Sequence, residues 1–320
     1  WENCVRGFMK KLLGILVLGL LLSNSAFADE RFEKDLKKIS KLNSFFNNKG
    51  EPFQIQKNII KNKTIIIIYT HGSHGKNQKI NSCKRSWNKI PPSIYQLDGT
   101  KIKDFTIKTY QLCSGVRGFT KKEEDLFWKV YDDNNQDVSK VLELKDKNGV
   151  FLIDKHGITK KRKVIKLKIK EFRDEGFKNI VLAGHSAGAW DSLILYSNFP
   201  SEINGVIAFN PARSGKYAKE LKKNKVWRGW KIWRDYKISL IKLEKLGKVL
   251  VYSHDKDSFE TPETLSFLSN SKAVQFIDLS DTSCKGKVKF NKYHGIPSTK
   301  CFADKEPKNK YIVKYLEEIF

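Results

Sequence analysis

Arginine, cysteine and long apolar runs are all scarce in this sequence, and each shortage excludes a class of protein. Only nine of the 61 basic residues are arginine, and the lysines are spread along the whole chain. Proteins that recognise phosphate groups favour the bidentate guanidinium of arginine. We therefore interpret the net charge of +26 as a solvated surface and expect no nucleic-acid partner, while weak contact with an anionic membrane or glycan surface stays open.

The five cysteines include no Cys-x-x-Cys pair, the spacing of a structural zinc site, so no metal is expected. Cys4 lies ahead of the mature chain that is defined below. The other four, Cys83, Cys113, Cys284 and Cys301, are an even number, which in an exported protein indicates two disulfides. Three pairings exist, and we favour Cys83–Cys113 with Cys284–Cys301 because each closes a modest loop.

The apolar run near the N-terminus, residues 12–22, is too short to cross a bilayer comfortably. Lys10 and Lys11 precede this run, and a small-x-small sequence follows it at residues 26–28. A basic start, a short apolar stretch and such a cleavage site are the three parts of a secretory signal. Residues 9–28 are therefore predicted to be a signal peptide.

The rest of the chain is expected to form one mature domain. Residues 1–8 are interpreted as read-through ahead of Met9, and the mature protein is expected to begin near Asp29 and to be periplasmic or secreted. An uncleaved N-terminal anchor is the alternative. Residues 29–320 are long enough to bury a substantial core, and α/β domains of this size are common.

Strand and helix patterns alternate along the mature chain, which predicts an α/β fold with a doubly wound, mostly parallel central sheet flanked by helices. Continuous β-branched runs indicate strands buried on both faces, and apolar residues three or four apart indicate helices. Strands are expected at 53–60, 64–70, 105–112, 179–183, 205–209, 248–252 and 273–279; helices are expected at 29–48, 121–134, 164–176, 189–196 and 309–319; and 136–148 is expected to be a polar connection.

The most informative segment is Gly184-His185-Ser186-Ala187-Gly188, which stands between a predicted strand and a predicted helix. This is G-x-S-x-G in the context that makes it a nucleophile elbow. A sharp turn from strand to helix exposes the serine hydroxyl, and glycines two residues before and after it keep other side chains away. The backbone N–H groups at the helix start then face the oxyanion that forms there.

A serine hydroxyl needs a base within hydrogen-bond reach and a carboxylate that orients the base. In doubly wound sheets such residues lie in loops at the carboxyl ends of strands. His294 follows the last predicted strand and is the favoured base, with His254 second. Asp257, which comes after the predicted 248–252 strand, is the favoured acid, and Asp255 is the alternative.

An oxyanion hole requires two N–H donors that face the developing charge. One is expected to be the amide of Ala187, directly after the serine. The second is expected from the loop after the 64–70 strand, where residues 71–75 have the pattern H-G-x-x-G. The amide of Ser73 is our choice, and Gly72 is needed to bring the backbone close.

With these motifs the chain resembles the α/β-hydrolase superfamily over roughly residues 60–300, with no subfamily identified. The resemblance rests on the elbow at 184–188, the His71-Gly72 loop, a carboxylate after a late strand, and His294 near the end. It implies a central sheet flanked by helices. It also implies hydrolysis through an acyl-enzyme, without metal or organic cofactor.

A helical insertion is expected between the strand at 205–209 and the acid, near residues 213–247. Trp227, Trp230 and Trp233 recur there every three residues, with lysine and arginine between them. Two interpretations stay open. The stripe packs on the core, or it is a lid that forms a wall of the substrate pocket or contacts lipid.

The favoured function is therefore an exported serine hydrolase that cleaves carboxylic esters through Ser186, His294 and Asp257. A peptidase or amidase that uses the same residues is one alternative. A non-catalytic protein that keeps the fold and binds anionic surfaces is another. The expected partner is a small-molecule ester. The sequence determines neither the acyl and alcohol parts of this substrate nor the oligomeric state.

Overall fold

The computed structural model describes residues 43–47, 59–72, 90–114, 121–135, 137–145, 149, 152, 157–212, 234–235, 238–286, 292–305 and 311–320. All of them lie in one compact unit, Asn43–Phe320. Several predictions concern residues outside the described ones: the signal peptide and the mature start at Asp29, most of the 53–60 strand, Ser73, Cys83, and the tryptophans at 227, 230 and 233. These stay predictions.

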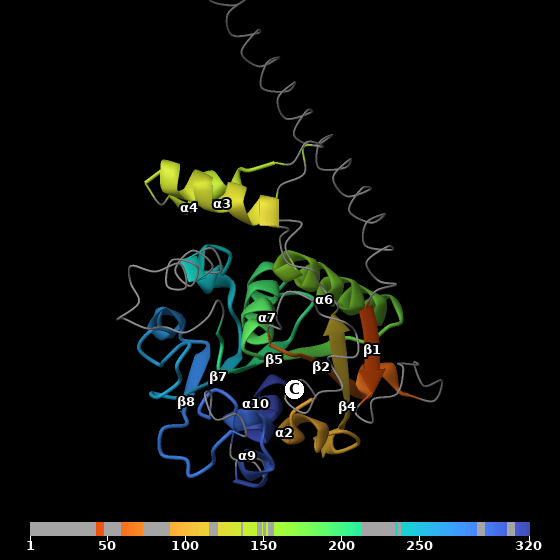
Figure 1. Cartoon of the computed structure of the whole chain (residues 1–320). Helices are drawn as coiled ribbons and strands as arrows, with labels where there is room; N and C mark the ends of the chain where they lie inside the picture. Colours follow the sequence, from red (N-terminus) through yellow and green to blue (C-terminus); the bar gives the residue numbers. More distant parts are fainter. Residues whose placement is uncertain are drawn as a thin grey trace, which may run out of the picture. The chain divides into compact units, whose positions relative to one another are not determined.

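The described strands form one eight-stranded sheet that is parallel except at one edge (Figure 1). Its order is β1-β4-β2-β5-β6-β7-β8, and the short β3 pairs with β4. Only β1 and β3 run antiparallel to their neighbour. The strands are β1 (Asn43–Asn47), β2 (Thr64–Thr70), β3 (Lys101–Ile102), β4 (Phe105–Ser114), β5 (Asn179–His185), β6 (Gly205–Phe209), β7 (Val249–Ser253) and β8 (Val274–Asp278).

The central strands form where the sequence has continuous β-branched and apolar runs. Every residue of β2, whose sequence is Thr-Ile-Ile-Ile-Ile-Tyr-Thr, is buried, and so is every residue of β6 and β7. Such runs suit parallel strands that are covered on both faces. The strands expected at 64–70 and 205–209 are confirmed to the residue, and those at 105–112, 179–183, 248–252 and 273–279 are confirmed within two residues at each end.

Helices cover both faces of this sheet. On one face the side chains of Ile67, Val181 and Leu250 share a core with Ile94 and Leu316 from two helices. On the other face lie α6 and α7, which pack on each other and on the central strands (Figure 1). The helices are α2 (Pro92–Tyr95), α3 (Lys121–Asp133), α4 (Val138–Leu142), α6 (Gly157–Asp174), α7 (Ala187–Asn198), α9 (Lys300–Lys305) and α10 (Ile312–Ile319), with single 3-10 turns at Lys61–Lys63, Leu243–Lys245, Ser266–Asn270 and Ile296–Ser298. Within the described part of the chain, none of the helices combines the length and apolar character that a bilayer crossing requires.

Three expectations about secondary structure were wrong. The helix predicted over 29–48 does not include residues 43–47, which form β1, because this segment pairs with β4 at the sheet edge. The connection predicted at 136–148 contains α4, where the Asp137 side chain caps the helix by accepting from Ser139 N at 2.8 Å. The helix predicted to begin at residue 164 begins seven residues earlier, at Gly157.

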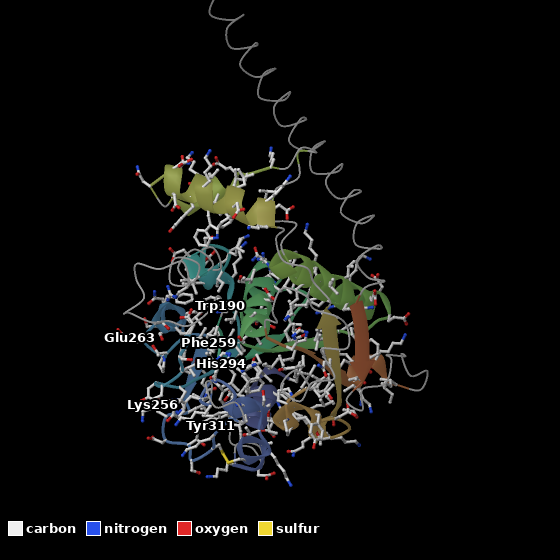
Figure 2. All side chains as sticks on the ribbon, in the orientation of Figure 1. Trp190, Lys256, Phe259, Glu263, His294 and Tyr311 are labelled. Carbon is white, nitrogen blue, oxygen red and sulfur yellow. A yellow bond between two sulfur atoms is a disulfide. The ribbon has the colours of Figure 1, made fainter. Side chains whose placement is uncertain are left out.

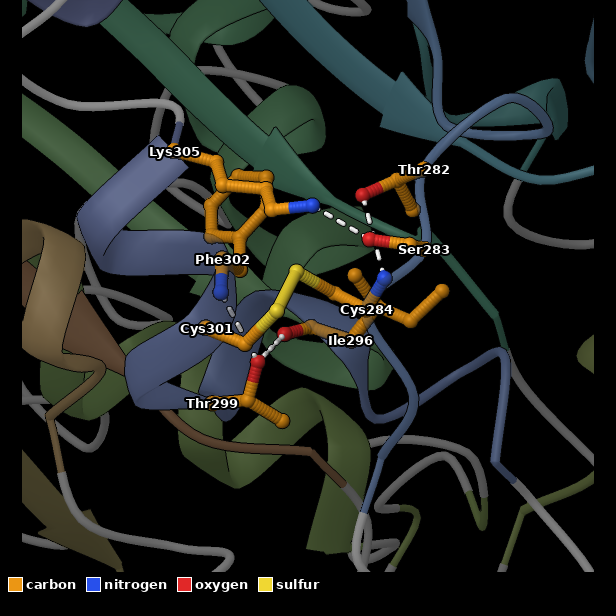
Figure 3. The surroundings of a disulfide bond; sticks show 8 residues. All are labelled: Thr282, Ser283, Cys284, Ile296, Thr299, Cys301, Phe302 and Lys305. Carbon is orange, nitrogen blue, oxygen red and sulfur yellow. Dashed lines mark hydrogen bonds between the residues drawn. A yellow bond between two sulfur atoms is a disulfide. The ribbon is translucent and has the colours of Figure 1, made fainter.

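One of the two expected disulfides is present (Figure 3). Cys284, after β8, is bonded to Cys301 in α9 across 17 residues of sequence. Around it, Lys305 Nζ donates to Ser283 Oγ, and Thr299 Oγ1 accepts from Phe302 N at 3.1 Å. The loop closed by this disulfide contains His294, so the covalent bond restrains the segment that carries the predicted base. The pairing of Cys83 with Cys113 stays a prediction.

Removing this disulfide is expected to destabilise the protein. A closed loop of this length restricts the unfolded chain enough to contribute about 3 kcal/mol. The double variant Cys284→Ala/Cys301→Ala should therefore lose about that much unfolding free energy in urea denaturation. Adding reductant to this variant tests the second pair, because a further loss of stability is expected only if Cys83 and Cys113 are also bonded. Unchanged stability of the double variant would contradict the prediction.

Candidate active site

The serine of the G-x-S-x-G motif lies in a strained turn between β5 and α7. Ser186 has φ 56° and ψ −121°, a conformation that non-glycine residues rarely adopt and that is typical of functional sites. Its N–H donates to Phe209 O at 3.0 Å, which ties the turn to the end of β6. A Cβ on Gly188 would lie 2.0 Å from Thr70 O, and one on Gly184 would lie 2.4 Å from Gly188 C. Both glycines are therefore required by close backbone packing.

The structure brings His294 and Asp257 together. His294 Nδ1 lies 2.7 Å from Asp257 Oδ2, and the two side chains are 6% and 1% exposed. The other carboxylate oxygen of Asp257 accepts from Phe259 N at 2.9 Å. Both oxygens of this carboxylate are thus held, one of them by the imidazole, which is the arrangement of an acid that orients a base.

The alternative acid and base pair with each other instead. Asp255 Oδ1 lies 2.7 Å from His254 Nδ1, and the Asp255 side chain is 53% exposed. His254 is buried, and its ring packs 4.4 Å from that of Tyr293. Of the two aspartates, only Asp257 contacts His294 in the hydrogen bonds that the structure records.

His294 lies beside the elbow. Its ring centroid is 4.6 Å from that of His185, the residue before Ser186, and its main-chain oxygen is 2.8 Å from His185 Nε2. Phe259 covers the ring at 4.7 Å between centroids, and Figure 2 labels both residues in the same region. The hydroxyl of Ser186 donates to Ala212 O at 3.2 Å in this structure. Hydrogen bonds between a nucleophile and its base commonly tighten only when substrate binds.

The loop after β2 also lies against the serine. A Cβ on Gly72 would lie 2.9 Å from Ser186 Cβ and 3.4 Å from Ser186 Oγ, so only glycine allows the backbone this close. The main-chain oxygen of His71 accepts from the buried ammonium of Lys161 on α6, and His71 Nδ1 lies 2.7 Å from Gly72 O. Ala187 is the first residue of α7, where backbone N–H groups have no partner within the helix.

Burial controls the charge of His185. Loss of hydration, together with the nearby His294 and Lys161, lowers the pKa of His185 to about 3, although the hydrogen bond to His294 acts in the opposite direction. The imidazole is therefore neutral at physiological pH. A neutral ring with Nε2 2.8 Å from a carbonyl oxygen carries its proton on Nε2 and donates it there.

Glu260 is a buried carboxyl group near the site, and no local sequence pattern predicts it. Burial raises its pKa to about 7, although Arg234, whose Nε is 3.4 Å away, lowers it. Arg234 also donates through Nη2 to Thr264 O. Because Arg234 belongs to the predicted insertion at 213–247, this contact joins that insertion to the loop that follows Asp257.

Among the described residues, no group of three or more His, Cys, Asp or Glu side chains has the arrangement to hold a metal ion. The groups that the described site brings together are a strained serine, a buried imidazole and carboxylate, and backbone N–H groups at a helix start.

The parallel sheet, the serine in a strand-to-helix turn and the order Ser186, Asp257, His294 along the chain define an α/β-hydrolase fold. No protein-family model matches the chain, and no curated protein matches it. Among solved structures the chain is similar to several proteins of low identity. Esterase 2 from Thermogutta terrifontis is 11% identical over 72% of this chain and 77% of its own, with a TM-score of 0.40. Monoacylglycerol lipase from Paleococcus ferrophilus is 15% identical over 87% and 98%, with a TM-score of 0.47. A phospholipase/carboxylesterase from Dyadobacter fermentans is 13% identical over 69% and 83%, with a TM-score of 0.31.

The low pKa of His185 predicts a specific loss of stability in acid. The unfolded imidazole takes up a proton below its ordinary pKa of 6.5, whereas the folded one does so only near 3. This group therefore costs no stability above pH 6.5, and stability is lost as the pH falls from 6.5 toward 3. Between pH 7 and pH 5 the loss from this one residue is about 2 kcal/mol.

The variant His185→Gln cannot titrate, so its unfolding free energy should fall less between pH 7 and pH 5 than that of the wild type, by about 2 kcal/mol. Urea denaturation of both proteins at the two pH values measures the difference. An equal fall in unfolding free energy in both proteins would mean that His185 takes up a proton between pH 7 and pH 5 in the folded state as readily as in the unfolded state.

Proposed function

We propose that this protein is a serine hydrolase that cleaves carboxylic esters through Ser186, His294 and Asp257. The observation that carries the proposal is the buried contact of 2.7 Å between His294 Nδ1 and Asp257 Oδ2 beside the elbow serine. A carboxylate in this position fixes the tautomer of the imidazole, so that its Nε2 is free to accept a proton.

The first half of the reaction forms an acyl-enzyme. The Ser186 hydroxyl rotates from Ala212 O to His294 Nε2, gives up its proton to that nitrogen and attacks the carbonyl carbon of the ester. The imidazolium then protonates the departing alcohol, while Asp257 offsets its positive charge. In the second half, His294 removes a proton from water as the water oxygen attacks the acyl carbon, and the imidazolium then returns this proton to Ser186 Oγ as the bond to the acyl group breaks and the acid is released.

The tetrahedral intermediates carry a negatively charged oxygen that needs donors. We assign this role to the amide of Ala187 at the start of α7 and to the amide of Ser73 in the loop after β2. The contact between Gly72 and Ser186 supports this assignment, because the loop reaches the serine only through a residue without a side chain. Lys161 on α6 restrains the same loop through a hydrogen bond from its ammonium group to His71 O. Preorganised donors of this kind lower the barrier without reorganisation during the reaction.

We propose that the protein is exported, with residues 9–28 as its signal peptide and a mature start near Asp29. The disulfide between Cys284 and Cys301 supports an oxidising compartment, because structural disulfides are rare in reducing ones. The substrate is a small-molecule ester. The insertion at 213–247 is proposed as a wall of the acyl pocket, with Trp227, Trp230 and Trp233 in contact with substrate.

Replacing the serine should abolish turnover and leave the fold intact. Ser186→Ala is expected to lower kcat on p-nitrophenyl esters by roughly 10⁶-fold. A fluorophosphonate probe should label the wild type at Ser186, as shown by peptide mapping, and should not label the variant. Ser197→Ala, which removes a buried hydroxyl farther along α7, is the control and should keep full labelling.

The choice between ester and amide substrates is tested separately, with esters of increasing acyl length first and matched amides second. Faster cleavage of the amides would replace the ester assignment with an amidase.

The two aspartates give a matched pair of variants. Asp257→Asn keeps the shape but removes the charge beside His294 and favours the wrong tautomer, so kcat should fall by about 10⁴-fold. Asp255→Asn makes the same chemical change two residues away, at an exposed side chain, and should leave kcat within about threefold because the side chain does not contact the base. Steady-state kinetics on one ester decides between them. The reverse ranking of the two variants would make Asp255 the acid.

A further inference from the structure

We propose that His185 and Asn210 are positioning residues that together hold the main-chain carbonyl of His294. This inference rests on the proposed function, since it assigns the support of the base in that mechanism. His185 is the residue between the first glycine and the serine of the G-x-S-x-G motif, and Asn210 directly follows β6.

Two side chains from neighbouring strand ends meet on one oxygen. His185 Nε2, at the end of β5, lies 2.8 Å from His294 O, and Asn210 Nδ2, directly after β6, donates to the same oxygen at 2.9 Å. Asn210 also donates to Tyr293 O at 3.2 Å. A carbonyl oxygen has two lone pairs, so the two donors satisfy it fully. All three groups are buried, where leaving such an oxygen unpaired is costly.

Asn210 is itself fixed in place by the backbone. It has φ 41°, in the left-handed region that asparagine adopts more readily than most other residues. Its N–H donates to Tyr252 O at 2.8 Å, which extends the pairing between β6 and β7 by one residue. The Asn210 side chain, which donates to the main chain at Tyr293 and His294, is therefore fixed at the carboxyl end of β6.

The uncharged state of His185 suits this role. The proposed mechanism forms an imidazolium at His294, and the ring of His185 is only 4.6 Å away. A second positive charge at this distance would oppose the proton transfer from Ser186. The other cation that acts on His185 is Lys161, whose ammonium is directed to His71 O. A neutral N–H donor holds the base without adding charge.

The result is a base restrained at three places. Asp257 holds Nδ1, Phe259 covers the ring at 4.7 Å, and the carbonyl is held by His185 and Asn210. Only Nε2, the nitrogen that exchanges protons in the reaction, is left out of this set of contacts. Misplacing a catalytic group by about 1 Å can cost about 10²-fold in rate, so supports of this kind affect kcat rather than substrate binding.

The experiment compares four variants with the wild type. His185→Leu removes the donor while keeping an apolar side chain, and His185→Gln keeps an N–H donor at a similar reach. Asn210→Asp replaces the donor with an acceptor of the same shape. Ser197→Ala is the control for loss of a buried hydrogen bond, since its hydroxyl bonds Ile194 O at 3.0 Å about 16 Å along α7 from Ser186.

We expect His185→Leu and Asn210→Asp to lower kcat for a p-nitrophenyl ester by about 100-fold, with KM within about threefold. His185→Gln should recover kcat to within about threefold of the wild type, and Ser197→Ala should not change it. All assays are made where denaturation shows each variant to be folded. A kcat of His185→Leu within twofold of the wild type, or equal losses in His185→Leu and His185→Gln, would overturn the proposal.

A second readout does not depend on activity. The proton on His294 Nδ1, assigned by its loss in His294→Asn, should exchange with water faster in His185→Leu and Asn210→Asp and at the wild-type rate in His185→Gln. This pattern in a protein without any hydrolase activity would overturn the proposed function and leave the positioning roles standing. Equal exchange rates in all variants would overturn the positioning roles, whatever the activity.

Discussion

The close approach of the elbow backbone to the end of β2 is the constraint on which the rest of the site depends. Gly188 lies so near Thr70 O that any side chain there would overlap with the neighbouring strand. The same approach brings Gly72 into contact with Ser186, so the strained serine and the loop that faces it are set by one packing requirement. Backbone atoms, which are the least adjustable part of a protein, therefore determine where a substrate carbonyl could lie.

The charge states of the groups around Ser186 are set by their burial. His185 loses its ability to take up a proton at ordinary pH, whereas Asp257 keeps two donors on its carboxylate and Lys161 is directed to a carbonyl oxygen. The imidazole of His185, the carboxylate of Asp257 and the ammonium of Lys161 thus each have a partner that matches their charge state. A site arranged in this way leaves His294 as the group best placed to gain and lose a proton during the proposed reaction.

Local sequence predicted the parts of the fold that depend on local pattern. The run Thr64–Thr70 is apolar enough to be buried on both faces of a sheet, and the glycines around Ser186 have no other reason for their spacing. Residues 43–47 were placed in a helix because the pairing that makes them a strand is with residues 110–114, far along the chain. The sequence favours Asp257 over Asp255 as the acid, but the contacts that separate the two, with His294 and with His254, are visible only in the folded structure. The contact of His185 with a residue 109 positions later left no local signal at all.

The way in which the proposed base is held has a chemical reason. An imidazole that transfers protons must keep Nε2 available, and its Nδ1 is taken by Asp257, so no ring atom remains for further support. Support can then come only through the faces of the ring and through the main chain of the same residue. Phe259 provides the first and the two donors on His294 O provide the second, while the disulfide after β8 restrains the loop as a whole. A base carried far in sequence from the serine requires this kind of restraint, because its described neighbours, residues 292–299, form turns and a short 3-10 helix rather than a long helix or a strand.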